Sequence, residues 1–253
     1  MTPPPWPDSG PLLFARFAYP PNALGYCGPD DSAALLEYAT AGVEDPGLRQ
    51  LARGFEGAWP YLELIAAANH IDDPLDAQVV AAYWIGNPML DQVPIALLGN
   101  SLNDRFRRIA GNHWNEIVEC VCEGSVPHHN FHVFSIYPWV GMLRGGLVDQ
   151  PLRVLDRCRV RWGQVISVQG GVAIVRASPL NWDGARLSLG APMLQAAACP
   201  VIAPQPRDWV ALHWDWVSAV LSTRQLHSLR EYTARELAVA NRPGAPALAR
   251  LSG

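Results

Sequence analysis

The chain has 253 residues, 49% of them hydrophobic, and a formal net charge of −4 at pH 7. This length supports one large domain or two small ones with real cores, and the mild acidity gives no general attraction to nucleic acid or to an anionic membrane. The sequence contains arginine but no lysine, which excludes a pyridoxal phosphate Schiff base and the lysine of a nucleotide-binding P-loop.

The amino-terminal sequence and the cysteines bear on where the protein works. The stretch MTPPPWPDSGP has neither the cationic nor the apolar region of a signal peptide, and no apolar run approaches the roughly 20 residues of a membrane span. The five cysteines follow no disulfide-framework spacing and are Cys27, Cys120, Cys122, Cys158 and Cys199. We therefore expect a cytoplasmic protein with reduced thiols and no membrane span.

The first half of the chain has helical spacing. Residues 1–30 are rich in proline and glycine and are expected to form an irregular arm. Asp31 or Ser32 can cap a first helix that Gly42 ends. Apolar residues at helical spacing then predict four further helices, over Pro46–Phe55, Pro60–Asn69, Asp73–Gly86 and Leu98–Ile109.

After Arg153 the pattern changes to alternation. Val160–Val168 is predicted to be a strand with an irregularity at Gly163, and Gly170-Gly171 indicates a hairpin turn. The same alternation predicts three further strands, namely VAIVR after that turn, Leu187–Leu189 and Asp208–Val217.

The last part of the chain combines a loop, a helix and a tail. Residues 191–207, rich in alanine and proline, are predicted to be a loop, and Ser222 with Gln225 forms a capping-box pattern ahead of a helix. The predicted fold class is α+β. It comprises a mostly α-helical domain, a small OB-like β-barrel with a C-terminal helix, and a flexible tail, over residues 1–150, 151–241 and 242–253.

Three histidines lie close together in the stretch HHNFH, at His128, His129 and His132. Imidazoles suit zinc, iron or nickel, and His128 and His132 lie one turn apart if the segment is a helix. The glutamate of an HExxH zinc-protease motif is missing. The apolar stretch FHVFSIYPW indicates a buried segment, in which a histidine is typically a hydrogen-bonded packing residue. Metal ligation by His128 and His132 and structural packing are both open.

Three of the thiols offer weaker signals. Cys120 and Cys122 would point roughly 200° apart on a helix, so they are interpreted as small buried hydrophobic residues. Cys27 lies in an irregular, glycine-flanked loop and could be a reactive thiol. Asp30 and Asp31 would raise rather than lower its pKa, and helix capping explains those two carboxylates.

The segment CRVRWGQV places Cys158 five residues ahead of Gly163. It resembles the opening of small NiFe-hydrogenase assembly chaperones, the HypC/HupF family, which is Cys, three residues, Pro, Gly, any residue and Val. Trp162 stands at the proline position. VQGGVAIV resembles that family's hairpin, DWVALHWDWV its later strand with His213 at the family's histidine, and TRQLHSLREYT its helix. The resemblance covers roughly residues 154–240.

The resemblance implies that Cys158, with His213 close by, holds an iron ion carrying cyanide and CO. It also implies that the iron is passed to a hydrogenase large-subunit precursor or another maturation protein. A thiolate is a soft donor that suits such iron. Arg157, Arg159 and Arg161 would share one strand face, where they could lower the pKa of the thiol, attract an anionic complex or contact the partner. Alternatively, they form a solvated edge that discourages strand association.

The whole chain also resembles an uncharacterised actinobacterial family, through FARFAYPPNALGYCGPDD, HNFHVFSIYPW and VLDRCRVRWG.

Three functions are predicted as alternatives. The first, an accessory or chaperone protein of NiFe-hydrogenase maturation, explains the most features. The second is a metal-dependent enzyme that uses His128, His129 and His132, and the third is an interaction protein whose cysteines and histidines are structural. No glycine-rich phosphate loop is present, so no nucleotide site is expected.

Overall fold

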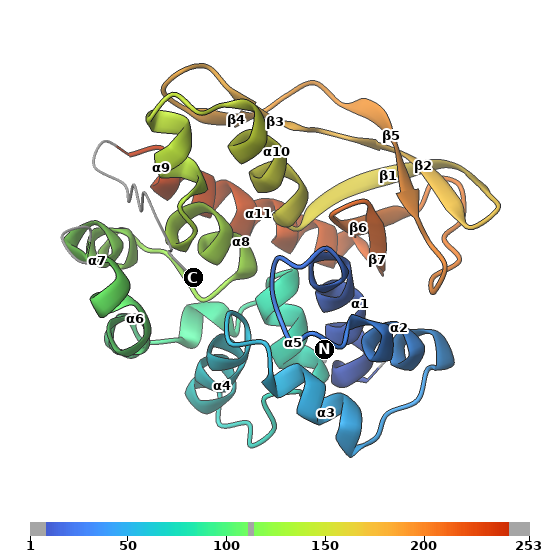
Figure 1. The fold of residues 1–253 in the computed structure, drawn as a ribbon, viewed down its shortest axis with the longest axis horizontal. Helices are drawn as coiled ribbons and strands as arrows, with labels where there is room; N and C mark the ends of the chain where they lie inside the picture. Colours follow the sequence, from blue (N-terminus) through green and yellow to red (C-terminus); the bar gives the residue numbers. More distant parts are fainter. Residues whose placement is uncertain (1–8, 111–113, 243–253) are drawn as a thin grey trace.

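The computed structural model describes residues 9–110 and 114–242 (Figure 1). The fold is α+β, as predicted: helices make up most of the chain before Cys158, and strands followed by one long helix make up the rest. The elements of the first part are α1 (Gly10–Ala23), α2 (Ser32–Ala41), α3 (Pro46–Arg53), α4 (Trp59–Ala68), α5 (Ala77–Trp84), the 3-10 turn η1 (Leu90–Gln92), α6 (Ile95–Ala110), α7 (Trp114–Cys122), α8 (His129–Phe131), the π-helical turn η3 (His132–Ile136), α9 (Trp139–Arg144) and α10 (Asp149–Cys158).

Local signals in the sequence set the ends of several helices. The Asp31 side chain accepts a hydrogen bond from the Ala34 N–H at 3.2 Å and so caps α2, and Gly42 ends that helix with φ at 65°. Asp45 caps α3, whose first residue is Pro46. The predicted Asp31 cap, the end at Gly42 and the place of Pro46 in a first turn are confirmed, because helix ends depend on residues within one turn of them.

The prediction of an irregular arm over residues 1–30 is wrong for the described part, since residues 10–23 form α1. Ser9 caps this helix, and Pro11 occupies its first turn, where a missing N–H costs no helical hydrogen bond. Phe14 and Phe17 of this helix are fully buried. Burying each such ring contributes roughly 1.5–3 kcal/mol, which offsets much of the cost of Pro20 and Pro21 inside the helix.

The second part of the chain is a small barrel with a helix after it. Its elements are β1 (Arg161–Gln169), β2 (Val172–Ala177), β3 (Leu180–Trp182), β4 (Leu187–Leu189), β5 (Met193–Ala198), β6 (Trp209–His213), β7 (Trp216–Leu221) and α11 (Thr223–Ala240). Strands pair in the order β1-β2-β5-β7-β6, and β6 pairs with β1 to complete the ring. β5 and β7 join through one parallel pair, Ala198 with Trp216. The predicted OB-like barrel is thereby confirmed.

Two details of the strands differ from the predictions. Residues 193–198 of the predicted loop form β5, because they pair along the whole length of β2. The irregularity of β1 lies between Val165 and Ser167 rather than at Gly163. Both depend on the partner strand, which periodicity within one segment does not reveal. The hairpin turn at Gly170-Gly171 and the capping box of Ser222 and Gln225 are confirmed.

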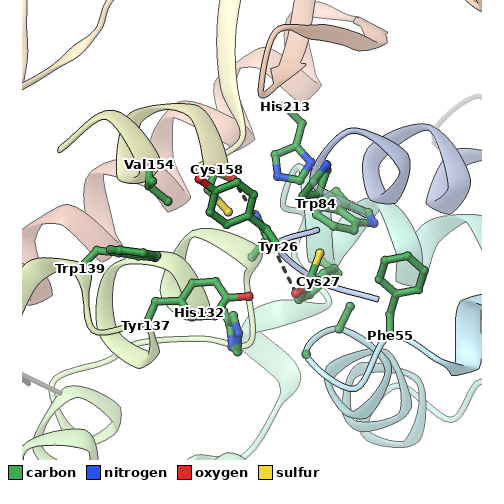
Figure 2. Close-up of a pocket in the computed structure, with 15 residues that line it drawn as sticks. Tyr26, Cys27, Phe55, Trp84, His132, Tyr137, Trp139, Val154, Cys158 and His213 are labelled. Carbon is green, nitrogen blue, oxygen red and sulfur yellow. Dashed lines mark hydrogen bonds between the residues drawn. The ribbon is translucent and has the colours of Figure 1, made fainter. Parts of the chain in front are cut away.

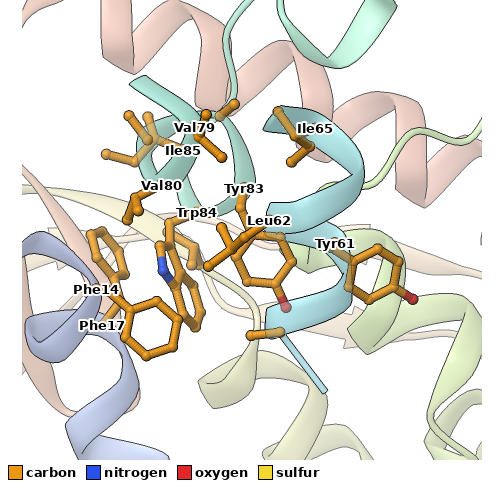
Figure 3. Close-up of a cluster of buried hydrophobic side chains, with 14 of the residues drawn as sticks. Phe14, Phe17, Tyr61, Leu62, Ile65, Val79, Val80, Tyr83, Trp84 and Ile85 are labelled. Atoms are coloured by element: carbon orange, nitrogen blue, oxygen red, sulfur yellow. The ribbon is translucent and has the colours of Figure 1, made fainter. Parts of the chain in front are cut away.

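Helices and barrel share a continuous core. One cluster of buried side chains runs from α1 through α7 and takes in residues of β6, β7 and α11. Trp84 lies near its centre (Figure 3), stacked on Phe17 with ring centroids 5.2 Å apart and edge-on to Tyr83 at 4.8 Å. α11 crosses the middle of the molecule between the helices and the strands (Figure 1). No helix in the described part is long and apolar enough to cross a membrane.

A buried carboxyl group on α11 holds the segment that leads to the histidines. Glu236 is fully buried. It accepts a hydrogen bond from the Ser125 hydroxyl at 2.8 Å and another from the Val126 N–H at 3.1 Å. Burial raises the pKa of Glu236 to about 7, although these two hydrogen bonds lower it. The folded protein therefore keeps this carboxyl protonated at pH values where the unfolded chain ionises it.

We expect Glu236→Gln to change how stability depends on pH. Because the pKa of Glu236 rises from 4.5 to about 7 on folding, its contribution to stability falls as the pH rises between those values and is constant above pH 7. A glutamine does not ionise, and it can accept from the Val126 N–H through its oxygen while its NH2 donates to the Ser125 hydroxyl oxygen. The unfolding free energy of the variant, relative to the original protein, should rise by about 2 kcal/mol between pH 5.5 and 7.5. Urea unfolding of both proteins at both pH values measures this difference. If the difference in unfolding free energy is the same at pH 5.5 and pH 7.5, the raised pKa of Glu236 is wrong.

Candidate metal centre

Three metal-ligating side chains meet where the helices contact the barrel. His129 is the first residue of α8, Cys158 the last of α10 and His213 the last of β6. One ligand atom from each lies within 4.8 Å of the other two, and all three residues are buried. Within residues 9–110 and 114–242, this is the one group of three or more such side chains with converging ligand atoms. We call it the three-donor group (Figure 2).

Cys158 lies at a helix end rather than at the start of a strand. α10 runs to Cys158, and β1 begins only at Arg161. Val154 and Leu155 of this helix are buried with the thiol in a second cluster of apolar side chains. The predicted strand face for Arg157, Arg159 and Arg161 is therefore wrong.

His213 offers an unpaired nitrogen to the group. Its ring is fully buried, and its Nδ1 lies 2.6 Å from the Phe17 carbonyl oxygen. A carbonyl oxygen only accepts hydrogen bonds, so Nδ1 carries the proton and Nε2 carries the lone pair. Nε2 is buried and makes no hydrogen bond, and the Cys158 carbonyl lies near enough to the ring to raise the pKa of His213 slightly against the effect of burial. Metal-ligating histidines are commonly oriented in this way, by one ring N–H that donates to a backbone carbonyl.

His129 is held by Cys158 itself. Its Nε2 lies 2.9 Å from the Cys158 carbonyl oxygen, so Nε2–H donates and the lone pair lies on Nδ1. The Tyr83 hydroxyl lies 3.3 Å from Nδ1 and donates to it. The ring packs on Trp84 at 4.5 Å and edge-on to His213 at 5.0 Å between centroids. A metal at Nδ1 would replace the tyrosine hydroxyl and keep the carbonyl contact.

Burial sets the protonation of the group. It lowers the pKa of His213 to about 4 and that of His129 well below its usual range, so both imidazoles are neutral at pH 7. Burial also raises the pKa of the Cys158 thiol far above its usual range, and nearby Cys27 adds to this, while the Trp214 indole N–H opposes it. Neutral imidazoles are ready to bind a metal. The thiol must release its proton when it does so.

A pocket lies beside the three-donor group. Its volume is about 80 Å³, which leaves room for several water-sized groups. Six of its fifteen lining residues are aromatic (Figure 2), namely Tyr26, Phe55, Tyr83, Trp84, Tyr137 and Trp139. His132 and a second thiol, Cys27, also line it. A ligand of the metal would be surrounded by ring faces that exclude bulk water.

The other predicted histidines lie outside the three-donor group. The His132 N–H and the His128 carbonyl oxygen are 3.4 Å apart, so the two residues are one turn apart, as predicted. Their rings have separate partners. His128 Nδ1 accepts from the Asn130 N–H at 3.1 Å, and His132 Nδ1 lies 3.1 Å from the Tyr61 hydroxyl. The sequence predicted ligation by His128 and His132, joined by His129 in the metal-dependent enzyme alternative, whereas the structure brings only His129 of the three to Cys158 and His213.

Two of the three arginines are interior residues. Arg159 and Arg161 are 1% and 2% exposed. Arg159 donates to the Asp156 carboxylate at 2.9 Å, and Arg161 donates to the Trp214 carbonyl oxygen at 2.8 Å. Arg157 is 41% exposed and pairs with the Asp215 carboxylate. A macromolecular partner can reach only Arg157 of the three, because the others are used to fix α10 and the β6–β7 turn.

Comparison with known proteins bears on the family alone. A family model described as "Family of unknown function (DUF6390)" matches residues 7–246. No curated protein and no solved structure matches the chain.

Proposed function

We propose that this chain, which belongs to the DUF6390 family, is a metal-binding accessory protein of NiFe-hydrogenase maturation. In this proposal, Cys158, His213 and His129 hold an iron ion that carries cyanide and CO until a partner protein receives it. The observation that carries the proposal is the convergence of Cys158 and His213 within 4.8 Å. These are the two residues that the resemblance to the assembly chaperones assigns to iron.

The donor set suits low-spin iron. A thiolate is a soft donor, imidazoles bind iron well, and cyanide and CO complete the coordination as ligands of the cargo. The unpaired Nε2 of His213 is the clearest sign of a missing partner, because a buried polar atom without one costs roughly 1–3 kcal/mol. Iron bound there would satisfy this atom.

The surroundings suit an anionic complex. The charged guanidinium of Arg161 lies near enough to His213 to lower its pKa further, after the larger effect of burial. Cyanide ligands offset the charge of ferrous iron, and the Cys158 thiolate would make the bound complex negative, so this buried positive charge would stabilise it. The aromatic pocket would shield it from water.

Arg157, on the surface beside the Cys158 helix end, would be available to the hydrogenase large-subunit precursor or to another maturation protein. A reducing cytoplasm would keep the thiols free.

Infrared spectroscopy tests this proposal. The protein is co-expressed with the machinery that synthesises the cyanide ligands and purified without oxygen. We expect cyanide and CO stretching bands on the purified protein, their loss in Cys158→Ala and their retention in Cys122→Ala, a variant of the exposed thiol on α7. A protein that carries no such bands, or that keeps them in Cys158→Ala, would contradict the proposal.

A metal-dependent enzyme is the second candidate, because the pocket beside the three-donor group gives access to a bound metal. Catalytic zinc sites commonly have three protein ligands and one open position. Stoichiometric zinc in protein that shows no cyanide or CO bands would favour this alternative over the iron carrier. In either case His129→Ala is the informative histidine variant, because His129 converges with Cys158 and His213.

A further inference from the structure

A second thiol faces the pocket of the three-donor group from a different part of the chain. Cys27 lies on the loop after α1, and it lines the same pocket as His129, Cys158 and His213 (Figure 2). It is the one cysteine among the lining residues besides Cys158. The two thiols are close enough for Cys27 to raise the pKa of Cys158. None of the structural roles described above uses it.

The loop that carries Cys27 is held in place by specific contacts. The buried side-chain amide of Asn22 donates to the Cys27 carbonyl oxygen at 2.8 Å and to that of Pro29 at 2.6 Å. Gly28 has φ at 86°, and a Cβ there would lie 2.3 Å from the Phe55 ring. Only glycine fits this approach. The main chain on both sides of Cys27 is thus fixed against the pocket wall.

The loop also touches the residue that covers Cys158. Tyr26 packs on Trp214 with ring centroids 4.4 Å apart. Trp214 has φ at 54°, a strained value for a bulky residue. The backbone N–H of Trp214 donates to the Arg157 carbonyl oxygen at 2.7 Å. This arrangement joins the loop after α1 to the ends of α10 and β6, the elements that carry Cys158 and His213.

We propose that Cys27 is a fourth donor to a metal held by His129, Cys158 and His213, and that it completes a set of two thiolates and two imidazoles. The inference rests on the proposed metal centre but not on the identity of its cargo. Such a set selects a borderline-soft divalent cation with tetrahedral preference, Zn²⁺ or its probe Co²⁺. The fully buried His213 Nε2, without a partner, is the independent sign of a ligand in this pocket.

Binding requires a small movement of Cys27. Its sulfur is outside the group whose ligand atoms all lie within 4.8 Å of one another. Because Asn22 holds the main chain, the sulfur approaches by rotation of the side chain between staggered rotamers. Both thiols release their protons as the cation binds. The fourth donor can leave by the reverse rotation, which opens one position to ligands carried by a cargo metal.

Cobalt spectroscopy tests the inference, because the sulfur-to-cobalt charge-transfer band grows with the number of bound thiolates. Metal-free protein is titrated with Co²⁺ without oxygen, in the original form and as Cys27→Ser, Cys158→Ser and the control Cys122→Ser. We expect one Co²⁺ per chain and, in Cys27→Ser, a band of about half the intensity with at least about tenfold weaker binding. Cys122→Ser should match the original protein.

The outcomes separate the two proposals. If Co²⁺ binds and Cys27→Ser leaves band and affinity unchanged, the fourth donor is wrong and the three-donor group stands. If the original protein binds no Co²⁺, both the proposed metal centre and the proposed fourth donor are wrong. Calorimetry gives a readout independent of spectroscopy. Zn²⁺ should bind Cys27→Ser at least about tenfold more weakly than Cys122→Ser, and equal affinities would overturn the inference.

Discussion

Replacement of Cys158 by serine is expected to weaken metal binding at least about 100-fold. Loss of a residue that merely orients a ligand costs about tenfold to 100-fold in affinity, and Cys158 is a ligand in the proposed centre. Its sulfur is the soft donor of the three-donor group and lies within 4.8 Å of a nitrogen of each of two neutral imidazoles. A serine hydroxyl at this buried position stays protonated and binds soft cations poorly. Competition with a chromophoric chelator for Zn²⁺ or Co²⁺ measures the change.

The matched control is Cys122→Ser, because Cys122 is an exposed thiol at the end of α7, outside the three-donor group. Its affinity should equal that of the original protein. The stability of the metal-free forms is measured in parallel, so that loss of the fold is not mistaken for loss of a ligand. A folded Cys158→Ser protein with undiminished affinity would exclude Cys158 from the centre.

The metal-free protein is expected to lose stability steeply on acidification. Burial lowers the pKa of His128 and His132 to about 3 and that of His213 to about 4, from 6.5. A folded pKa below the unfolded one makes a contribution that is complete above pH 6.5 and is lost as the pH falls toward the folded value. At pH 5 each of the three costs about 2 kcal/mol, and together about 6 kcal/mol. His129 adds to this loss.

Glu236 opposes the effect, because it regains about 2 kcal/mol as the pH falls from 7.5 to 5. The net loss still amounts to about 4 kcal/mol or more, a large part of the 5–15 kcal/mol typical of a folded protein. Urea unfolding in the presence of a chelator at pH 7.5 and pH 5 measures it. His128→Asn keeps an acceptor for the Asn130 N–H and should lose about 2 kcal/mol less over this range.

The control for this series is His227→Gln, since the His227 side chain is 81% exposed. It should follow the original protein at both pH values. Equal acid sensitivity of His128→Asn and the original protein would show that His128 does not resist protonation in the folded state.

Local features of the chain were predictable because they depend on residues a few positions apart. Asp31, Gly42 and the Ser222–Gln225 capping box end or begin helices through contacts within one turn. The hairpin at Gly170-Gly171 follows from the conformational freedom of glycine. Alternation after Arg153 predicts the change from helices to strands, and the resemblance in that part singles out Cys158 and His213.

Other features depend on partners far away in the sequence. α1 forms despite its prolines because Phe14 and Phe17 find a core to fill, and β5 forms because β2 lies beside it. Arg161 is interior because it is hydrogen-bonded to Trp214, 53 positions away. No signal within one segment reports such contacts.

The candidate site shows the same division. The sequence by itself determined that one thiol and one histidine of the barrel, Cys158 and His213, were the residues to examine, and it marked the HHNFH stretch as metal-capable. Only the tertiary structure decided which histidine of that stretch joins them. His129 lies against Cys158 and His213, whereas the rings of His128 and His132 are hydrogen-bonded to Asn130 and Tyr61. The choice rests on how α8, α10 and β6 pack, because ring direction depends on the burial of neighbours rather than on spacing along the chain.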